Sequence, residues 1–323
     1  MNISGTDFQS MRLMARVLTL YYEEGHLQAQ IAKELGLSSA KVNRLIKQGR
    51  AMGLVEIKIR TPFQPLFNLE RRIKNSFEID DVLVAPTVSD NPDVVLQNVG
   101  SAAADVLLKN LKDGDTICIT GGKGVSAVVE GLNPERKYDI EVVPATGCVQ
   151  GKHYTDVNHV ATQLAEKLGG RALQIHAPLF ADTAEQKDML MAMRSVNEVL
   201  DRARQATLAI VGVGSILTVD STYYDLHPMP KGDQDEINRV GAVGELLGHL
   251  MDEDGKVCDY DLNSRLVGLN PAELAKVPLT MGVASGVNKV APICSALRGR
   301  HLKTVVIDEA TATGVLNTLS GEI

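Results

Sequence analysis

Seven short apolar runs alternate with helix-like patterns between residues 81 and 308. They are DVLVAP (81–86), TICIT (116–120), IEVVPA (140–145), ALQIHAP (172–178), TLAIVGVG (207–214), LTMGVAS (279–285) and KTVVID (303–308). Continuous Val, Ile and Leu runs separated by helices are typical of a parallel sheet covered on both faces. We therefore expect an α/β fold in which ligands bind at the carboxyl ends of the strands.

A different pattern, two short helices around a tight turn, occupies residues 28–47. Gly36 is placed to end the first helix, because glycine adopts the left-handed conformation without steric cost. Ser38 or Ser39 is placed to cap the second helix. On that helix an apolar stripe is opposed by a small and polar stripe with the same helical spacing. The apolar stripe comprises Val42, Leu45, Ile46 and Gly49, and the polar stripe comprises Ala40, Asn43, Arg44 and Lys47.

The polar stripe suits a DNA recognition helix, whose N-terminal end must approach base edges closely. Asn43 can pair with adenine and Arg44 with guanine, whereas lysines reach phosphates. An ordinary helical hairpin with solvated charges is the alternative. The small Ala32 and Gly36 and the apolar Leu37 fall at helix-turn-helix offsets, which favours DNA binding. The predicted DNA-binding residues are Gln28, Ser39, Ala40, Lys41, Asn43, Arg44 and Lys47.

Charge is distributed unevenly between this segment and the rest of the chain. Residues 1–60 contain nine Lys and Arg against five Asp and Glu, a net charge of +4. The full chain of 323 residues carries −7, so the remaining residues carry −11. A basic head on an acidic body suits a regulator that touches DNA only through its head.

Length and local composition predict two domains. Residues 1–60 form a helix-turn-helix domain with an amphipathic first helix over residues 11–24 and a wing strand in LVEIKIR (54–60). TPFQP (61–65) is the expected linker, because two prolines break any continuing element. A helix over residues 66–77 then leads into the larger domain, residues 61–323.

Several classes of protein are excluded or disfavoured by composition. The four cysteines and seven histidines show neither metal-ligand spacing nor a disulfide framework. We expect reduced thiols in a cytoplasmic protein. There is no signal-peptide pattern and no apolar run of membrane-spanning length. The sequence also lacks a nucleophile elbow or an ordered nucleophile–base set, so we expect no metal, no cofactor, no membrane partner and no catalytic site.

Two glycine-rich segments follow predicted strands. In TGGKGVS (120–126), glycine amides, Lys123 and the start of a helix predicted over residues 127–131 could cradle a phosphate or sugar phosphate. The spacing is not that of a Walker A loop, and a plain glycine-rich turn is the alternative. VGVGSI (211–216) lacks the third glycine of a dinucleotide fingerprint, so a turn that lines the site is favoured over NAD binding.

Two charged residues occur in similar positions. Glu245 lies in GAVGELLG (241–248), where its carboxylate could accept hydrogen bonds from sugar hydroxyls or could be a solvated acid at a helix start. Lys289 lies in ASGVNKVAPI (284–293), after a predicted strand and at a helix start. A lysine is electrostatically unfavourable there, which favours an anionic partner or ligand.

With these motifs in hand, the chain resembles the SorC-type sugar-binding transcriptional regulators of bacteria over nearly all of residues 11–319. This family includes the central glycolytic gene, deoxyribonucleoside and autoinducer-2 regulators. The resemblance rests on six stretches: QIAKELGLSSAKVNRLIKQGRAMGLVEIKI (30–59), TGGKG (120–124), GAVGELLGHLMDEDGKV (241–257), LNSRLVGL (262–269), GVASGVNK (282–289) and VVIDEATATGVL (305–316).

The resemblance implies an N-terminal helix-turn-helix and an effector domain with the fold of sugar-phosphate isomerases and glucosamine-phosphate deaminases. It also implies a phosphorylated sugar or polyol as effector and a homotetramer that binds an operator. By position, Gly122, Lys123 and Gly124 match the family's phosphate loop, Glu245 an acidic sugar-hydroxyl contact, and Lys289 a ligand-contacting lysine. Asn158, in YTDVNHVATQLA (154–165), matches a polar position near the ligand.

The chain departs from the family pattern at three points. The loop that often reads Ser-Trp-Gly-x-Thr is TGGKG here and lacks the last hydroxyl. Leu27-Gln28 replaces a frequent Thr-Gln at the start of the second helix, and Glu245 replaces the commoner Asp. We predict a cytoplasmic repressor of carbohydrate-metabolism genes. The alternative is a sugar-phosphate isomerase or deaminase with a DNA-binding head, and a nicotinamide-dependent redox sensor is the weakest hypothesis.

Overall fold

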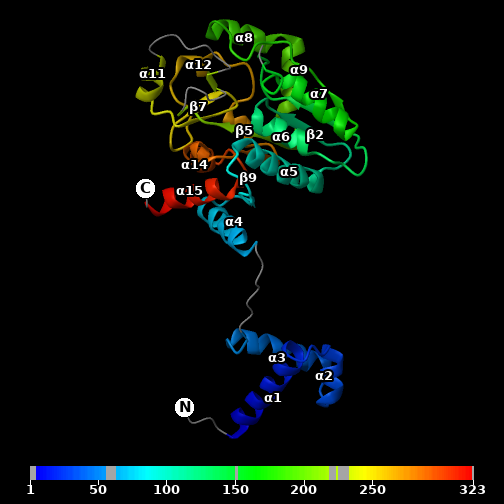
Figure 1. Ribbon diagram of the computed structural model, residues 1–323. Coiled ribbons are helices and arrows are strands. Elements are labelled where there is room, and N and C mark those ends of the chain that lie inside the picture. Colours follow the sequence, from blue (N-terminus) through cyan, green and yellow to red (C-terminus); the bar gives the residue numbers. More distant parts are fainter. Residues whose placement is uncertain (1–4, 56–62, 150–151, 218–222, 225–232, 322–323) are drawn as a thin grey trace. The chain divides into compact units, whose positions relative to one another are not determined.

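The computed structural model describes residues 5–55, 63–149, 152–217, 223–224 and 233–321 (Figure 1). It divides into two compact units, Met1–Gln64 and Pro65–Ile323, each with its own hydrophobic core. The expected boundary after residue 60 lies four residues before this division. The division itself lies within residues 61–65, the segment predicted as the linker. The predicted wing strand cannot be judged, because residues 56–60 lie outside the described residues, and residues 54–55 are not in a strand.

Residues 5–55 of the N-terminal unit form three helices, α1 (Gly5–Tyr22), α2 (Gln28–Glu34) and α3 (Ser39–Ala51). Their apolar stripes meet in one core, and the stripe predicted for α3 is confirmed as buried. Gly49 lets the Leu18 side chain of α1 pack directly against α3, because a Cβ there would lie 2.6 Å from Leu18 Cδ1. The core residues are Met14, Val17, Leu18, Leu20, Ile31, Ala32, Val42, Leu45 and Ile46.

The turn between α2 and α3 forms as the sequence predicts. Gly36 has φ 64°, the left-handed conformation expected after a helix. The Leu37 N–H donates to the Ala32 carbonyl at 2.8 Å, which closes the end of α2. Of the two candidate caps it is Ser38 that caps α3, because its Oγ accepts from the Lys41 N–H at 3.2 Å.

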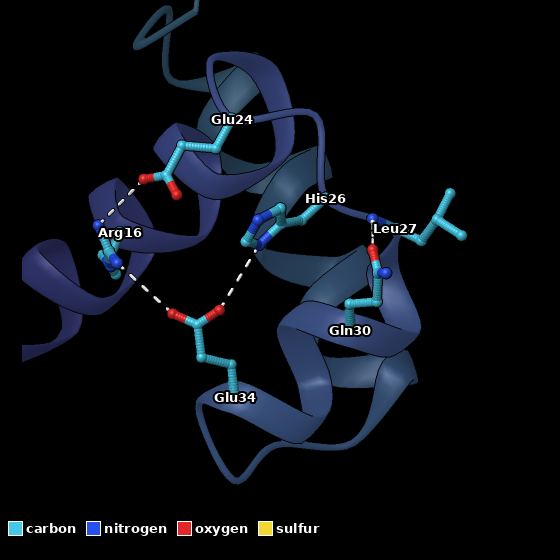
Figure 2. A network of polar contacts seen from close by, with 6 residues as sticks. All are labelled: Arg16, Glu24, His26, Leu27, Gln30 and Glu34. Carbon is cyan, nitrogen blue, oxygen red and sulfur yellow. Dashed lines mark hydrogen bonds and ion pairs between the residues drawn. The ribbon is translucent and has the colours of Figure 1, made fainter.

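The start of α2 differs from the Thr-capped form expected of the family. Leu27 occupies the cap position and has no side chain that could accept a hydrogen bond. Gln30 compensates in part, because its Oε1 accepts from the Leu27 N–H at 2.8 Å (Figure 2). The backbone N–H of Leu27 at this helix start is thereby satisfied by a side chain that lies three residues later in the helix.

A polar network connects α1 to α2 on the surface of the unit (Figure 2). Arg16 lies 3.2 Å from Glu24 and 3.4 Å from Glu34, and His26 Nδ1 lies 3.5 Å from Glu34 Oε2. The Arg16 side chain is half exposed, so each pair contributes less than about 1 kcal/mol. The network orients α1 and α2, whereas the apolar core stabilises the unit.

The second unit is built on a parallel sheet, as predicted. Its strands follow the order β1-β9-β8-β5-β2-β3-β4, and all neighbouring pairs on this path are parallel. Their bounds are β1 (Asp81–Ala85), β2 (Thr116–Ile119), β3 (Glu141–Pro144), β4 (Arg171–Ala172), β5 (Leu208–Gly214), β8 (Leu279–Val283) and β9 (Thr304–Asp308).

The helices of this unit connect the strands. Most of them bury apolar residues in the core around the sheet, whereas Ile237 and Leu262 belong to a separate, smaller apolar cluster. They are α4 (Gln64–Phe77), α5 (Pro92–Asn110), α6 (Lys123–Gly131), α7 (Val157–Leu168), α8 (Ala184–Ala192), α9 (Arg194–Arg204), α11 (Asp233–Arg239), α12 (Asp261–Ser264), α13 (Pro271–Leu274), the 3₁₀ turn η1 (Val287–Lys289), α14 (Val290–Arg298) and α15 (Glu309–Ser320). The chain leaves β2 toward β3 and leaves β5 in the opposite direction toward β8. The crevice between β2 and β5 is therefore the switch point at which such sheets bind ligands.

Three local features differ from the prediction. Of ALQIHAP only Ala172 is in a strand, the two-residue β4, and the backbone of Ile175 bonds to the side chain of Asn158 instead of to a strand. The helix expected from residue 127 begins at Lys123. A hairpin of β6 (Gly244–Leu246) and β7 (His249–Met251) pairs antiparallel with the end of β5.

All four cysteines are free thiols, as expected. Burial raises the pKa of Cys118 to about 12 and, with the nearby Asp252, the pKa of Cys258 to about 11. These two thiols therefore stay protonated and unreactive at neutral pH. None of the described helices is both long and apolar enough to cross a lipid bilayer.

Candidate functional site

A pocket of about 620 Å³ lies at the carboxyl end of the sheet, where β1, β2, β5, β8 and β9 finish. Its walls come from the segments that follow these strands and from the β6–β7 hairpin. They include the switch point, through Gly121–Gly124 after β2 and Gly212–Ser215 at the end of β5. Of the predicted effector-binding residues, the structure brings Gly122, Lys123, Gly124, Glu245 and Lys289 together here.

The glycine loop after β2 is shaped by close contacts that exclude side chains. A Cβ at Gly121 would lie 2.4 Å from the Thr155 carbonyl oxygen, and a Cβ at Gly124 would lie 2.8 Å from the Val283 carbonyl oxygen. Gly122 has φ 121° and donates its N–H to the Tyr154 carbonyl at 2.6 Å. Gly121 and Gly124 are thus required by close contacts and Gly122 by its positive φ, and together they shape the start of α6 at the pocket.

The N-terminus of α6 has no side chain to cap it, because Gly122 occupies the cap position. The first-turn amides of a helix have no intrahelical acceptors, and the helix dipole adds partial positive charge. Lys123 stands at the first helical position, with its Nζ 5.8 Å from the Tyr154 ring centroid. This side of the pocket therefore attracts an anion.

Glu245 reaches the pocket from the β6–β7 hairpin. The hairpin register places Glu245 opposite Gly214, and a Cβ at Gly214 would lie 2.0 Å from Glu245 Oε1. The Gly248 N–H donates to Glu245 Oε2 at 2.8 Å across a turn in which Leu247 has φ 57° and Gly248 φ 81°. Burial raises the pKa of Glu245, although this hydrogen bond and the charge of Lys289 lower it. Because Glu245 lies in β6, the alternative of a solvated acid at a helix start is wrong.

Lys289 reaches the same pocket from the segment that follows β8. It ends the 3₁₀ turn η1 and precedes α14. The Gly286 N–H at the start of this turn donates to Asp308 Oδ1 at 2.8 Å, which fixes the turn to the end of β9. Burial lowers the pKa of Lys289, the charge of Lys123 lowers it further, and Glu245 raises it.

Glu245 and Lys289 influence each other without touching. Among the described residues, no ion pair within 4.0 Å joins them. One Glu245 oxygen is held by a backbone amide, and Lys289 retains its three donors. A ligand hydroxyl between them could donate to the carboxylate and accept from the ammonium. The arrangement can bind a polyhydroxylated molecule that carries an anionic group.

Three further carboxylates line the pocket and were missed by the sequence analysis: Asp90, Asp93 and Asp308. Asp308 is buried, caps α15 through the Thr311 N–H at 3.0 Å, and is the last residue of β9. A polar residue at the carboxyl end of a predicted strand was a signal that could have found it. Asp90 lies between β1 and α5 and Asp93 in the first turn of α5, and neither position shows such a pattern.

The structure does not place Asn158 among the residues that line the pocket. Its Nδ2 donates to the Ile175 carbonyl and its Oδ1 accepts from the Ile175 N–H, both at 2.9 Å. The amide is thereby used on both sides to hold the start of α7 against the segment that follows β4.

The predicted DNA-binding residues lie together on the surface of the N-terminal unit. The six on or beside the exposed face of α3, namely Ser39, Ala40, Lys41, Asn43, Arg44 and Lys47, are all exposed, and Gln28 is partly exposed at the start of α2. An additional cation, Arg50, lies in the last turn of α3 against Tyr22. The surface presents small residues at one end of the helix and cations along the rest.

Comparison with known proteins identifies the family. The family model described as "Putative sugar-binding domain" (Sugar-bind) matches residues 61–317, and the model of sigma-70 region 4 matches residues 13–52. The erythritol catabolism regulatory protein EryD of Brucella abortus is 30% identical over 312 residues, which cover 96% of this chain and 98% of the relative. The transcriptional regulator LsrR of Enterobacter sp. (strain 638) is 30% identical over 316 residues, with coverage of 97% and 95%. The crystal structure of the full-length sorbitol operon regulator SorC from Klebsiella pneumoniae matches with a TM-score of 0.74 and 25% identity, covering 95% of this chain and 98% of that one. The chain belongs to the SorC family of sugar-binding transcriptional regulators.

Membership of the SorC family confirms the predicted fold class and the prediction of a DNA-binding transcriptional regulator with a sugar-type effector. The matched relatives are named as regulators and not as enzymes. The comparisons therefore support the regulator and do not support the alternative of an isomerase or deaminase that carries a DNA-binding head.

Proposed function

We propose that this protein is a cytoplasmic repressor of carbohydrate-metabolism genes whose effector is a phosphorylated sugar or polyol. Residues 1–60 bind operator DNA, and residues 61–323 bind the effector and form a homotetramer. The observation that carries the proposal is the charge arrangement of the pocket. One side presents the uncapped N-terminus of α6 with Lys123 and Lys289, and Glu245 lies close by.

The positive side of the pocket is the phosphate site. The amides of Lys123 and Gly124 lie in the first turn of α6, where a phosphate is favoured by both hydrogen bonding and the helix dipole. Burial lowers the pKa of Lys289 most and the charge of Lys123 lowers it further, and a dianion between the two lysines offsets their repulsion.

The sugar hydroxyls are read by the remaining polar groups. Glu245 accepts from hydroxyls, and the carboxylates of Asp90, Asp93 and Asp308 are within the same pocket. The pocket volume of about 620 Å³ lies inside the range of roughly 300–1,000 Å³ that is typical of small-molecule sites. Asn158 acts on the site indirectly, by holding α7 in place.

On the DNA side, α3 is the recognition helix. Asn43 and Arg44 reach base edges, Lys41 and Lys47 reach phosphates, and Ser39 and Ala40 allow close approach. Phosphate contacts are salt-sensitive, so binding by a single head is weakened by salt. A tetramer places several heads on one operator and gains affinity through effective concentration.

Control by the effector follows from linkage. A ligand shifts the protein away from the DNA-binding arrangement only by its differential affinity for the two arrangements. A hundredfold loss of operator affinity requires about 2.7 kcal/mol of such differential binding.

A thermal-shift screen of the full-length protein tests the effector class. The panel pairs polyol and sugar phosphates with their unphosphorylated parents, including erythritol and sorbitol with their phosphates, because relatives are named for regulating these pathways. A ligand that binds only the folded protein raises the melting temperature by mass action. We expect stabilisation by phosphorylated members alone. Stabilisation by the parents alone would refute the phosphate site and leave Glu245 as the main ligand contact.

A further inference from the structure

The end of the recognition helix carries an arginine whose position is fixed by a tyrosine from another helix. Arg50 lies in the last turn of α3, and Tyr22 is the last residue of α1. The Arg50 Nε–H donates to the Tyr22 hydroxyl, and the guanidinium carbon lies 5.4 Å from the Tyr22 ring centroid. The side chain is therefore held by both a hydrogen bond and a cation–π contact.

This contact uses only one side of the guanidinium. Nε is bonded to Tyr22. Among the residues that the structure describes, no hydrogen bond engages the two terminal nitrogens, whose four N–H groups have the planar arrangement that matches phosphate oxygens. A side chain held in this way loses less conformational entropy when it binds a ligand. The geometry leaves a preorganised fork at the surface.

The charge of Arg50 is not compensated by its partner. Within the part of the chain that the structure describes, no carboxylate forms an ion pair with Arg50, and the Tyr22 hydroxyl is neutral. Arg16 in the same unit shows the opposite arrangement, since Glu24 and Glu34 neutralise its guanidinium (Figure 2). The unit thus contains one arginine tied to carboxylates and one held with its full charge exposed.

Arg50 also continues the exposed face of α3. It follows Lys47 by three residues and Asn43 by seven, a spacing that keeps all three on one side of a helix. At about 1.5 Å per residue, Arg50 lies roughly 10 Å beyond Asn43 along the helix axis. A helix whose N-terminal end enters the major groove carries its far end toward the sugar–phosphate backbone.

We infer that Arg50, held by Tyr22, binds a backbone phosphate of DNA and fixes the orientation of α3 in the groove. This inference rests on the proposed role of α3 as the recognition helix. A purely structural role, in which Arg50 and Tyr22 only join α1 to α3, predicts a different response to salt.

The test measures the affinity of the full-length protein for a fluorescent duplex of about 30 base pairs of mixed sequence, by anisotropy at several KCl concentrations. Each phosphate contact contributes about −0.9 to the slope of log affinity against log salt. Arg50→Ala should therefore make the slope shallower by about 0.9 for each head that binds. Raising KCl from about 50 to about 200 mM should then weaken the parent about 3.5 times more than the variant, per head.

Three variants separate the roles. Arg50→Lys keeps the charge and should keep the parental slope. Tyr22→Phe keeps the ring but removes the hydroxyl, and should lower affinity while leaving the slope unchanged. Arg16→Ala removes the same formal charge from a neutralised site and should leave the slope unchanged. Melting temperatures of all variants report on the stability of the fold.

An Arg50→Ala variant with the parental salt slope, whether or not it melts at a lower temperature, would overturn the inference. Tyr22→Phe with parental affinity would overturn the part assigned to the tyrosine. The Arg44→Ala variant distinguishes a failure of this inference from a failure of the recognition-helix assignment. If Arg44→Ala weakens binding to DNA and Arg50→Ala does not change the slope, only this inference fails. If neither variant affects binding, the assignment of α3 as the recognition helix fails as well.

Discussion

Replacing Lys289 with methionine should weaken ligand binding without lowering the stability of the ligand-free fold. Methionine has a similar length and no charge. The pKa of Lys289 lies below its ordinary value, even though Glu245 raises it. In the ligand-free protein, the desolvation of the charged Lys289 is therefore more unfavourable than its attraction to Glu245 is favourable. Without ligand, Lys289→Met should melt at the same temperature as the parent or higher.

The ligand-bound state should respond in the opposite direction. A hydrogen bond between an ammonium and a phosphate contributes about 1.5–3 kcal/mol net. Its loss corresponds to a decrease in affinity of about 10- to 150-fold. Isothermal titration calorimetry with the sugar or polyol phosphate selected by the thermal-shift screen measures this change. Because the ligand stabilises the fold by mass action, its effect on the melting temperature should shrink in parallel.

Lys276→Met is the matched control. Lys276 is exposed and precedes β8, whereas Lys289 follows the same strand. The five residues of β8 therefore separate Lys276 from the pocket by roughly 16 Å. This variant should bind the ligand with parental affinity. Parental affinity in Lys289→Met would refute the argument, and so would a melting temperature lowered by several degrees with no loss of binding.

Three further outcomes follow from the same geometry. Gly124→Ala should weaken ligand binding and destabilise the fold by about 1–3 kcal/mol in denaturant melts, because its Cβ would lie 2.8 Å from the Val283 carbonyl oxygen. Gly212→Ala, whose Cβ would have its nearest neighbour at 4.0 Å, is the control for fold stability, and an equal loss of stability in both variants would contradict the steric argument. Arg44→Ala should cost about 1–3 kcal/mol of operator affinity and relax the preference at one base pair, as scored by binding to a library of operator variants. Since a bound anion raises the lowered pKa of Lys289, binding should take up protons and weaken as the pH rises through that pKa. Calorimetry in two buffers of different ionisation enthalpy would contradict this if it detected no proton uptake.

Local patterns were sufficient to predict most of the architecture. The helix-turn-helix depends on contacts between near neighbours in the chain: the φ of Gly36, the cap at Ser38 and the periodicity that buries Val42. The parallel strands were predicted because continuous apolar runs fit a sheet covered on both faces. Lys123 and Lys289 were found because both follow such strands.

The parts that were missed depend on contacts between distant residues. The β6–β7 hairpin has strands of only three residues, and its turn uses Leu247 at positive φ, which no turn pattern predicts. The pairing of Gly214 with Glu245 joins segments 31 residues apart. Asn158 was expected near the ligand from the resemblance to the family, and the sequence could not show that Ile175 would occupy its amide.

The central claim is that a ligand in the body pocket controls DNA binding by the head. The most direct measurement is the affinity of the full-length protein for its operator, by fluorescence anisotropy, with and without saturating ligand. The account predicts that the ligand weakens operator binding in the parent protein. By reciprocity, the operator must weaken ligand binding by the same factor. Equal operator affinity with and without a ligand that demonstrably occupies the pocket would contradict the account.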